Sequence, residues 1–432
     1  MPELNESVVI KNGSVIDATG ERAADVLVAD GRVVEVGPGL KGDRELDASG
    51  CVVVPGLVDL HVHLREPGGE DAETIDTGAR AAALGGFTAI VAMPNTEPPH
   101  DEPSVVASVL AAGARSSCDV HAAGCITEGR EGAALAPLGE LHALGVRIFT
   151  DDGSCVEQAG VMRRALEYAR SLPNAVIAQH AEDPSLADGG HMHEGEWSSR
   201  LGIAGRPAVA ESAIVARDCI LAELTGGRVH FLHLSTAAAV DMVRDAKARG
   251  LAVTAEAAPH HFSLTDAACA SFDPAFKVHP PLRSEADVAA VKQGLADGTI
   301  DAIATDHAPH AVETKERPFE EAPPGMLGLE TALALTITEL VDPGVLSLSE
   351  ALALLSWRPA AIAGLAEHGQ PIAPGAPANL CVIDPTITWD VDPTRLASKA
   401  RNTPFGGRTL TGRVRHTVLR GTPVVVDGEA CR

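Results

Sequence analysis

The sequence predicts an α/β protein: an eight-stranded (β/α)8 TIM-type barrel with a small β-sandwich domain formed by both termini. From about Pro55 onward, short apolar runs alternate with longer amphipathic stretches, which is typical of strand and helix units around a parallel sheet. Eight such runs can be counted, and eight is the strand number of this barrel. We therefore place the barrel in residues 55–368 and the small domain in residues 1–54 and 369–432.

Each of the eight runs begins with apolar residues and ends in polar ones. The runs span residues 56–64, 87–95, 119–127, 146–153, 175–183, 228–235, 252–261 and 301–310. The segments between them, among them 72–86, 158–172 and 236–250, carry apolar residues at three- and four-residue spacing and predict helices. Barrel enzymes keep their active sites on the loops that follow the strands, so the polar ends of the runs predict the site.

The two ends of the chain are expected to form β-structure. Residues 1–54 contain short strand-like runs with turn signals at Asn12-Gly13 and Asp30-Gly31, and the chain from Gly369 onward has the same character. Both dipeptides are favoured in two-residue hairpin loops, so we expect a hairpin at each. Neither end is long enough to build a core alone, and we expect the two to pack together as one sandwich.

The composition argues against several classes of partner. The chain has 34 Lys and Arg against 59 Asp and Glu, a formal net charge of -25, and such a surface repels nucleic-acid phosphates and anionic membranes. Its eight cysteines include no C-x-x-C pair, so no zinc knuckle or dithiol redox site is indicated. Without a basic, apolar leader or an apolar run of membrane-spanning length, we expect a cytoplasmic protein.

Histidines and an aspartate at the ends of the predicted strands indicate a metal centre. His61 and His63 are two residues apart on the first strand, so both side chains point to one side and can hold one ion. This pair alone is a weak signal. His180, His233 and Asp306, which end AVIAQH, HFLH and AIATD in the fifth, sixth and eighth runs, make the signal specific. Buried groups of this kind cost free energy unless they are paired or bind a metal.

Two adjacent divalent ions need a shared anionic ligand because the cations repel each other. The fourth run offers Asp151 and Asp152. We select Asp152 as the bridge and keep Asp151 as the alternative, while the simplest other reading is that both cap the loop. The nitrogen and oxygen ligands suit zinc, with manganese or cobalt as alternatives, and we expect two Zn²⁺ per subunit. Bound zinc makes water acidic near neutral pH, and Asp306 is expected to carry the proton to the leaving nitrogen.

Ordered motifs along nearly the whole chain resemble the dihydroorotases of the amidohydrolase superfamily, in particular the long bacterial type. They are GLVDLHVHLREPG, AMPNTEP, FTDDG, QHAED, FLHLST, EAAPHHF, ATDHAPH, GLET and ARNTPF. The resemblance implies reversible, zinc-dependent cyclisation of N-carbamoyl-L-aspartate to (S)-dihydroorotate and water, a step of pyrimidine (UMP) biosynthesis. It also implies one metal on His61, His63 and Asp306, a second on His180 and His233, and Asp152 between them.

The same resemblance implies residues that bind the substrate. Arg65 and Asn95 would hold the substrate carboxylate with help from His310, and the guanidinium fork of Arg matches a carboxylate in a bidentate way. The alternatives are a surface ion pair for Arg65 and a turn cap for Asn95. Backbone groups of Pro324 and Gly325 would hydrogen-bond the pyrimidine ring, because Gly lets a ligand approach the backbone closely.

One position departs from the family pattern. The family reads K-x-N-P-P-L-R after the seventh strand, and His279 stands here in place of the Asn. An imidazole makes single hydrogen bonds but cannot present the two-sided edge of an amide, so ring recognition is the part of the function most affected. We keep His279 among the substrate-binding residues, together with His63 beside the metals.

Two rival functions remain to be separated. A hydantoinase or allantoinase would share the barrel and the metals, but those families resemble one another in a lysine on the fourth strand, where this chain has FTDDG. A non-catalytic homologue could serve as a scaffold for aspartate carbamoyltransferase, yet all six ligand positions are present here. The resemblance leaves an active enzyme that associates with that carbamoyltransferase as an alternative, and it implies a homodimer.

Overall fold

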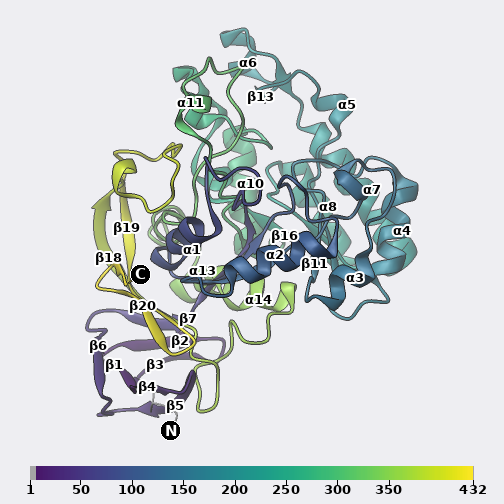
Figure 1. Ribbon diagram of the computed structural model, residues 1–432. Coiled ribbons are helices and arrows are strands. Elements are labelled where there is room, and N and C mark those ends of the chain that lie inside the picture. The colour runs from purple at the N-terminus through teal and green to yellow at the C-terminus, as the bar shows by residue number, and fades with distance from the viewer. Residues whose placement is uncertain (1–5, 432) are drawn as a thin grey trace.

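The computed structural model describes residues 6–431 (Figure 1). Each of the eight predicted runs contains a strand. The strands are β8 (Leu57–Val62), β9 (Phe87–Ala92), β10 (Asp119–Ala122), β11 (Ile148–Phe149), β12 (Val176–Gln179), β15 (Val229–Phe231), β16 (Val253–Ala257) and β17 (Ala302–Ile303). Their side chains are largely buried because helices cover them, as expected for parallel strands. The predicted α/β class is confirmed.

These strands pair in parallel and in chain order. Ladders join β8, β9 and β10 in one sheet and β11, β12, β15, β16 and β17 in another. A parallel bridge between Gly124 and Phe149 connects the two sheets, and a second bridge, between Val62 and His307, connects the last run to the first. The carboxyl ends of all eight strands therefore face the same side.

Helices occupy the three segments in which they were predicted. These are α1 (Ile75–Leu84), α4 (Ala159–Ala169) and α8 (Ala237–Ala248). The side chains of Thr74 and Thr236 cap the first and the third by accepting backbone N–H groups. The remaining α-helices are α2 (Pro103–Gly113), α3 (Leu138–Ala143), α5 (Pro184–Ala187), α6 (Glu196–Leu201), α7 (Val209–Thr225), α9 (Pro259–Ser263), α10 (Glu285–Ala296), α11 (Val312–Lys315), α12 (Ala332–Thr336), α13 (Leu348–Leu355) and α14 (Trp357–Ala363).

Strands from both termini form one mixed, seven-stranded sheet in the order β21-β20-β19-β18-β7-β2-β3. Its members are β2 (Ser14–Asp17), β3 (Gly20–Ala23), β7 (Val52–Pro55), β18 (Leu380–Asp390), β19 (Thr409–Leu419), β20 (Thr422–Val426) and β21 (Glu429–Ala430). A second sheet, in the order β5-β4-β1-β6, contains β1 (Val8–Lys11), β4 (Asp25–Ala29), β5 (Arg32–Gly37) and β6 (Arg44–Asp47). Ile10, Val28, Val53 and Val382 belong to one buried cluster that both sheets line.

One of the two predicted hairpins is wrong. Asp30-Gly31 does join the antiparallel pair β4 and β5. After Asn12-Gly13, however, the chain crosses to the other sheet: β1 pairs with β4 and β6, whereas β2 pairs with β3 and β7. A Cβ at Gly13 would lie 2.8 Å from Cγ2 of Val53, so the turn is packed against the seven-stranded sheet. A turn signal specifies the local reversal but not the partner of the next strand.

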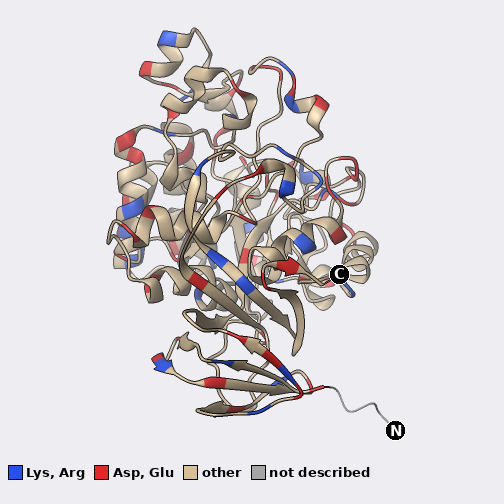
Figure 2. Cartoon of the chain, turned by 90° about the vertical axis from the view of Figure 1, so that its left-hand side faces the viewer, with Lys and Arg blue, Asp and Glu red and all other residues tan. Residues whose placement is uncertain are grey.

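Charged residues are not confined to one part of the fold. Figure 2 shows acidic and basic residues distributed over the helical part and the β-sheets alike. Within residues 6–431, no helix is both long enough and apolar enough to span a membrane.

Candidate metal centre and substrate cavity

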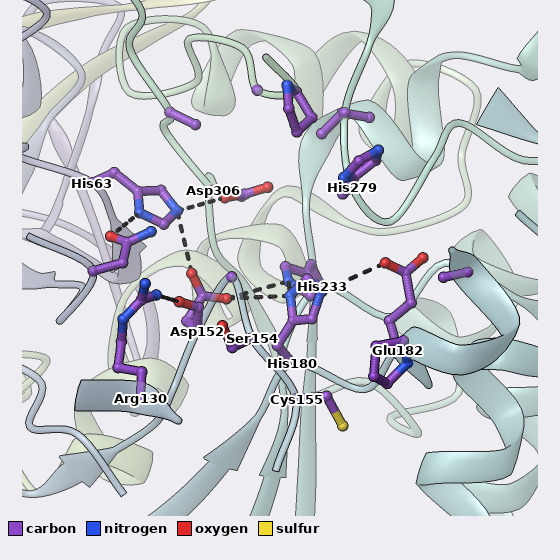
Figure 3. Close-up of a pocket in the computed structure, with 18 of the residues that line it drawn as sticks. His63, Arg130, Asp152, Ser154, Cys155, His180, Glu182, His233, His279 and Asp306 are labelled. Carbon is purple, nitrogen blue, oxygen red and sulfur yellow. Dashed lines mark hydrogen bonds and ion pairs between the residues drawn. The ribbon is translucent and has the colours of Figure 1, made fainter. Parts of the chain in front are cut away.

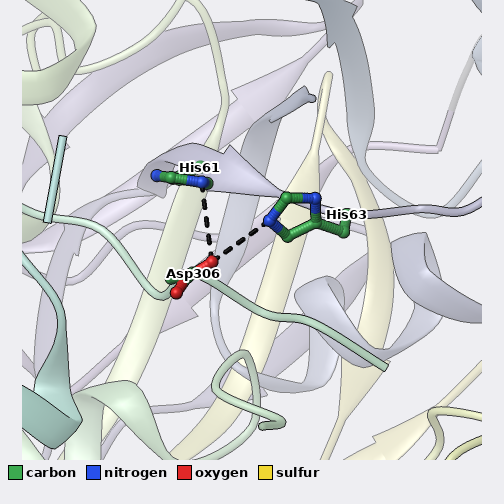
Figure 4. Close-up of side chains that lie close together, drawn as sticks. All are labelled: His61, His63 and Asp306. Atoms are coloured by element: carbon green, nitrogen blue, oxygen red, sulfur yellow. Dashed lines mark hydrogen bonds and ion pairs between the residues drawn. The ribbon is translucent and has the colours of Figure 1, made fainter. Parts of the chain in front are cut away.

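His61, His63 and Asp306 meet where the first and last of the parallel strands end (Figure 4). Oδ1 of Asp306 lies 3.1 Å from Nε2 of His63 and 3.5 Å from Nε2 of His61. The two imidazoles come from the same strand at a spacing of two residues, so both point to the inside. The three side chains can place one nitrogen or oxygen each within 4.8 Å of the others and could hold a metal ion.

Asp152 lies between this group and a second pair of histidines (Figure 3). Its Oδ2 lies 3.3 Å from Nε2 of His61 and 3.5 Å from Nε2 of His63. Its Oδ1 lies 3.4 Å from Nδ1 of His180 and 3.6 Å from Nε2 of His233. Each carboxylate oxygen thus faces one pair of imidazoles, which is the arrangement that a ligand shared by two ions requires.

Asp151, the alternative bridge, is engaged elsewhere. Its Oδ1 accepts hydrogen bonds from the backbone N–H groups of Ile126, at 2.8 Å, and Thr127, at 3.0 Å, and its Oδ2 accepts one from the Thr127 hydroxyl. Neighbouring residues at a strand end point to opposite sides, so only one of the two aspartates can face the histidines. Asp151 therefore fastens the loop that follows β10.

Several polar atoms of the cluster are buried without a hydrogen-bond partner among the described residues. They are Nε2 of His61, Nδ1 of His233 and Oδ1 of Asp152. Leaving such a group unpaired costs about 1–3 kcal/mol. A divalent cation would satisfy the acceptor atoms in this set, since imidazole nitrogens and carboxylate oxygens are its usual ligands. The residues present therefore fit a metal centre.

The backbone is strained at three of the predicted site residues. Arg65, His233 and Asp306 have φ angles of 63°, 34° and 48°. Side chains other than Gly rarely adopt this left-handed region, at a cost of about 1–3 kcal/mol each, and such residues cluster at functional sites. The fold holds these three side chains in orientations that an ordinary strand end would not provide.

Glu256 is a further member of the centre, and the sequence analysis missed it. This fully buried carboxylate on β16 lies 2.9 Å from Nδ1 of His61 and 3.0 Å from Nε2 of His230. Burial opposes its ionisation, but the hydrogen bonds from His230 and His61 outweigh it and lower its pKa to about 2. With Nδ1 donating to Glu256, His61 presents Nε2 to the centre. The sequence feature that could have indicated it is a single Glu inside an otherwise largely apolar strand, because a buried carboxylate costs free energy unless it is paired.

Electrostatics set the charges around the centre. Burial would raise the pKa of Asp152 and Asp306, but the nearby charge of His61 outweighs it and lowers the pKa of both carboxyls below the ordinary range. Burial lowers the pKa of His279 and of His310 to about 3, so both rings are neutral at physiological pH. Burial also lowers the pKa of Arg65 to about 10, which leaves its guanidinium charged.

A cavity of about 610 Å³ opens onto the cluster. All seven predicted substrate-binding residues line it: His63, Arg65, Asn95, His279, His310, Pro324 and Gly325. Of the predicted metal ligands, His61 is buried behind the cavity wall, and the others line it.

Several of the predicted substrate-binding residues contact one another or their neighbours. Oδ1 of Asn95 lies 2.8 Å from Nδ1 of His63, which explains how that ring is oriented toward the centre. Nε of Arg65 donates to the backbone oxygen of Pro309 at 3.1 Å, and Nε2 of His310 lies 2.8 Å from the backbone oxygen of Pro324.

Charged residues that were not predicted also line the cavity, among them Arg130, Glu182 and Arg206. Arg130 donates to the backbone oxygen of Asp152 at 2.8 Å, and Arg206 forms an ion pair with Glu182. Burial opposes ionisation of Glu182, but the hydrogen bond from His180 lowers its pKa to about 2. Arg130 ends a three-residue 3-10 helix, Arg206 lies on the two-residue strand β14 (Gly205–Arg206), and Glu182 lies in a loop. Such short segments carry no periodic pattern, so only the folded arrangement reveals these residues.

Comparison with known proteins identifies the family. A family model described as dihydro-orotase-like matches residues 50–264. Proteins named dihydroorotase are similar along nearly the full chain: that of Streptomyces coelicolor is 51% identical and covers 95% of this chain and 97% of its own. That of Pelotomaculum thermopropionicum is 50% identical, with 97% and 99% covered.

Solved structures agree on the fold. The L-hydantoinase (dihydropyrimidinase) of Arthrobacter aurescens superposes with a TM-score of 0.89 at 27% identity, covering 98% of this chain and 97% of its own. The dihydropyrimidinase of Brevibacillus agri has a TM-score of 0.85 at 24% identity, with 98% and 96% covered, and supports the fold alone. The two dihydroorotases above are about half identical to this chain over almost its whole length. This chain therefore belongs to the dihydroorotase family.

Proposed function

We propose that this chain catalyses the reversible cyclisation of N-carbamoyl-L-aspartate to (S)-dihydroorotate and water, a step of pyrimidine biosynthesis. The observation that carries the proposal is the cavity that joins the histidine and aspartate cluster to Arg65. A hydrolytic centre beside a buried cation suits a cyclic amide that bears a carboxylate. Relatives about half identical over almost the whole chain are named for this activity.

Two zinc ions would be held by the cluster in this proposal. His61, His63 and Asp306 would hold one, His180 and His233 the other, and Asp152 would lie between them; the distances from its two oxygens support this assignment. When bound, zinc lowers the pKa of water to near neutrality and polarises a carbonyl. Zinc fits this set of imidazoles and carboxylates better than a hard cation such as magnesium does.

Arg65, Asn95 and His310 would receive the substrate carboxylate. The charged guanidinium of Arg65 supplies the attraction, and its bond to the Pro309 oxygen restricts its position. His310 is neutral and adds no second charge, and the hydrogen bond between its Nε2 and the backbone oxygen of Pro324 fixes the ring beside Arg65. Backbone groups of Pro324 and Gly325, with the imidazole of His279, would contact the ring, since all three line the same cavity.

Asp306 would move the proton. In ring opening, a water oxygen forms a bond to the ring carbonyl carbon while the bond from that carbon to the ring nitrogen breaks. The carboxylate of Asp306 accepts the proton that the water loses and delivers it to the leaving nitrogen. In cyclisation the same carboxylate takes the proton from the attacking nitrogen and returns it to the departing water oxygen.

The proposal extends to the architecture. The bridges Gly124–Phe149 and Val62–His307 support a closed (β/α)8 barrel, which we assign to residues 55–368. Residues 1–54 and 369–432 would form the small β domain, supported by the sheet that their strands share. A homodimer, association with aspartate carbamoyltransferase and a cytoplasmic location stay predictions.

Hydantoinase activity is the second candidate, because solved hydantoinases share the fold. The test is to assay the purified, zinc-loaded protein with dihydroorotate, hydantoin, dihydrouracil and allantoin, following ring opening by ultraviolet absorbance. We expect turnover of dihydroorotate alone. Preference for a ring without a carboxylate would overturn the substrate but leave the metal chemistry standing, and no turnover by the metal-loaded protein would favour a scaffold.

A further inference from the structure

The long connection between β18 and β19, residues 391–408, carries a side chain that contacts two segments lining the substrate cavity. That residue is Asn402, which is 6% exposed. Its Nδ2 donates to the backbone oxygens of Ala308, at 2.9 Å, and Gly325, at 3.1 Å. Its Oδ1 accepts from the backbone N–H of His310, at 3.1 Å. One amide group thus ties together two separate chain segments.

Both of these segments line the cavity. Ala308 and His310 belong to the loop after β17, and Gly325 belongs to the next segment of the chain. The first segment also holds Arg65, whose Nε donates to the oxygen of Pro309. Through its side-chain hydrogen bonds to the backbone of both segments, Asn402 therefore influences the positions of most of the groups assigned to bind the substrate carboxylate and ring.

We propose that Asn402 is a positioning residue that sets the distance between the carboxylate-binding and ring-binding sides of the cavity. This inference rests on the proposed function, because it takes dihydroorotate as the ligand that spans the two sides. Asn402 does not line the cavity, so its effect on the substrate is transmitted by the segments it joins.

The chemistry of the side chain explains why an amide is present. Asn offers two N–H donors and a carbonyl acceptor, and all three are used by Ala308, Gly325 and His310. Asp would keep the acceptor for His310 but would place a carboxylate oxygen against two carbonyl oxygens. Ala would leave three buried backbone groups without these partners.

The two segments approach each other so closely that their spacing matters. Gly325 has a φ of 135°, and a Cβ added to it would lie 2.7 Å from Cβ of Ala308 and 2.8 Å from Nε2 of His310. A shift of a few tenths of an ångström therefore alters which atoms face the substrate. Misplacing groups that position the substrate by about 1 Å lowers catalysis about 10²-fold, and smaller shifts lower it less.

The connection that carries Asn402 is itself fixed. The hydroxyl of Ser398 and the backbone N–H of Lys399 both donate to the buried carboxylate of Glu73, which follows the first parallel strand. Phe405 is 2% exposed and packs in an apolar cluster on the other side of Asn402. The amide is thus held at both flanks and can in turn hold the cavity wall.

The test compares Asn402→Ala and Asn402→Asp with Asn379→Ala. Asn379 is a matched control because it is also buried, at 4% exposure, and also joins two segments: its Nδ2 donates to the oxygen of Glu367 and its Oδ1 accepts from the N–H of Arg420. It does not line the substrate cavity. The zinc content of each protein is measured alongside.

We expect both Asn402 variants to raise KM for dihydroorotate about tenfold while kcat falls less than about threefold, with zinc content unchanged. Hydrogen–deuterium exchange should become faster in peptides that cover residues 308–327, because the N–H of His310 loses an acceptor in the Ala variant and the segments separate in both. Asn379→Ala should lower the thermal midpoint comparably while KM and exchange in 308–327 stay as in the wild type.

Unchanged exchange in residues 308–327 in a folded Asn402 variant would overturn the inference, as would a KM increase of equal size in Asn379→Ala. If Asn402→Ala does not fold, the same measurements on Asn402→Asp test the inference, because Asp keeps an acceptor for the N–H of His310. Absence of dihydroorotate turnover by the zinc-loaded wild type would instead contradict the proposed function. The exchange measurement would then still decide whether Asn402 holds the two segments together.

Discussion

A histidine and an aspartate interact at each end of the parallel strands, and the two pairs differ in how their polar atoms are satisfied. At the amino ends, Nδ1 of His368 lies 3.1 Å from the hydroxyl of Thr88, and its Nε2 lies 3.1 Å from Oδ2 of Asp119. At the carboxyl ends, Nε2 of His61 and Oδ1 of Asp152 are buried and have no hydrogen-bond partner among residues 6–431.

The difference shows what separates a structural cluster from a binding cluster built of the same residue types. A buried polar group that is fully paired contributes to the stability of the fold, whereas one that lacks a partner costs free energy until a ligand arrives. His368 and Asp119 therefore stabilise the amino ends of the strands. His61 and Asp152 are preorganised for a cation.

The largest expected effect is on kcat, which should fall when an aspartate at the carboxyl ends of the strands is changed but not when one at the amino ends is changed. Asp306→Asn should lower kcat for dihydroorotate by about 10³-fold, because the amide cannot accept the proton from water. Asp119→Asn should leave kcat within about twofold and lower the free energy of unfolding by about 1–3 kcal/mol. Steady-state kinetics and urea unfolding measure the two effects. Near-normal turnover by Asp306→Asn would exclude it as the proton carrier.

Metal content tests the two neighbouring aspartates. Asp152→Asn should lose at least one of about two bound zinc ions per chain, since it removes the shared anionic ligand. Asp151→Asn should keep the zinc and lose stability, because it weakens the hydrogen bonds to Ile126 and Thr127. Elemental analysis after dialysis checks both. Zinc loss confined to Asp151→Asn would reverse the assignment.

A smaller effect is expected for the carboxylate behind the centre. Glu256→Gln should weaken zinc binding about 10- to 100-fold, because the amide can no longer serve as a charged acceptor that orients His61. Competition with a chelator measures the affinity, and circular dichroism controls for folding. Unchanged zinc affinity would show that Glu256 serves only the structure.

The smallest effect concerns a half-buried acid, Glu330, whose ionisation is opposed more by its surroundings than it is favoured by the charge of Arg401. Burial raises the pKa of Glu330 from 4.5 to about 7, although it accepts a hydrogen bond from the N–H of Ala397. Its contribution to stability is therefore complete below about pH 4.5 and is lost as pH rises through 7. Glu330→Gln keeps the acceptor and cannot ionise.

Relative to the wild type, Glu330→Gln should be more stable at pH 8 than at pH 5 by about 1–2 kcal/mol, after allowance for the partial exposure of the group. Urea unfolding at the two pH values measures the difference. A stability difference that does not change between pH 5 and pH 8 would mean that Glu330 ionises normally in the folded protein.

The sequence by itself determined the features that depend on local pattern. Alternating apolar runs and amphipathic segments predicted the parallel strands and the helices between them, because burial on both faces requires continuous apolar strands. The two-residue spacing of His61 and His63 predicted that they share a side. The ordered motifs indicated the family that the full-length relatives later established.

Only the tertiary structure decided how distant parts of the chain meet. No local signal indicated that β2 joins the seven-stranded sheet after Asn12-Gly13 or that Glu256 lies against His61. Nor did any indicate that Asn402 bonds Ala308, 94 residues away. Such pairings depend on the packing of whole elements, and a hydrogen bond between two of them leaves no periodicity in either segment. The sequence thus specified where polar groups emerge from the strands, and the fold selected their partners.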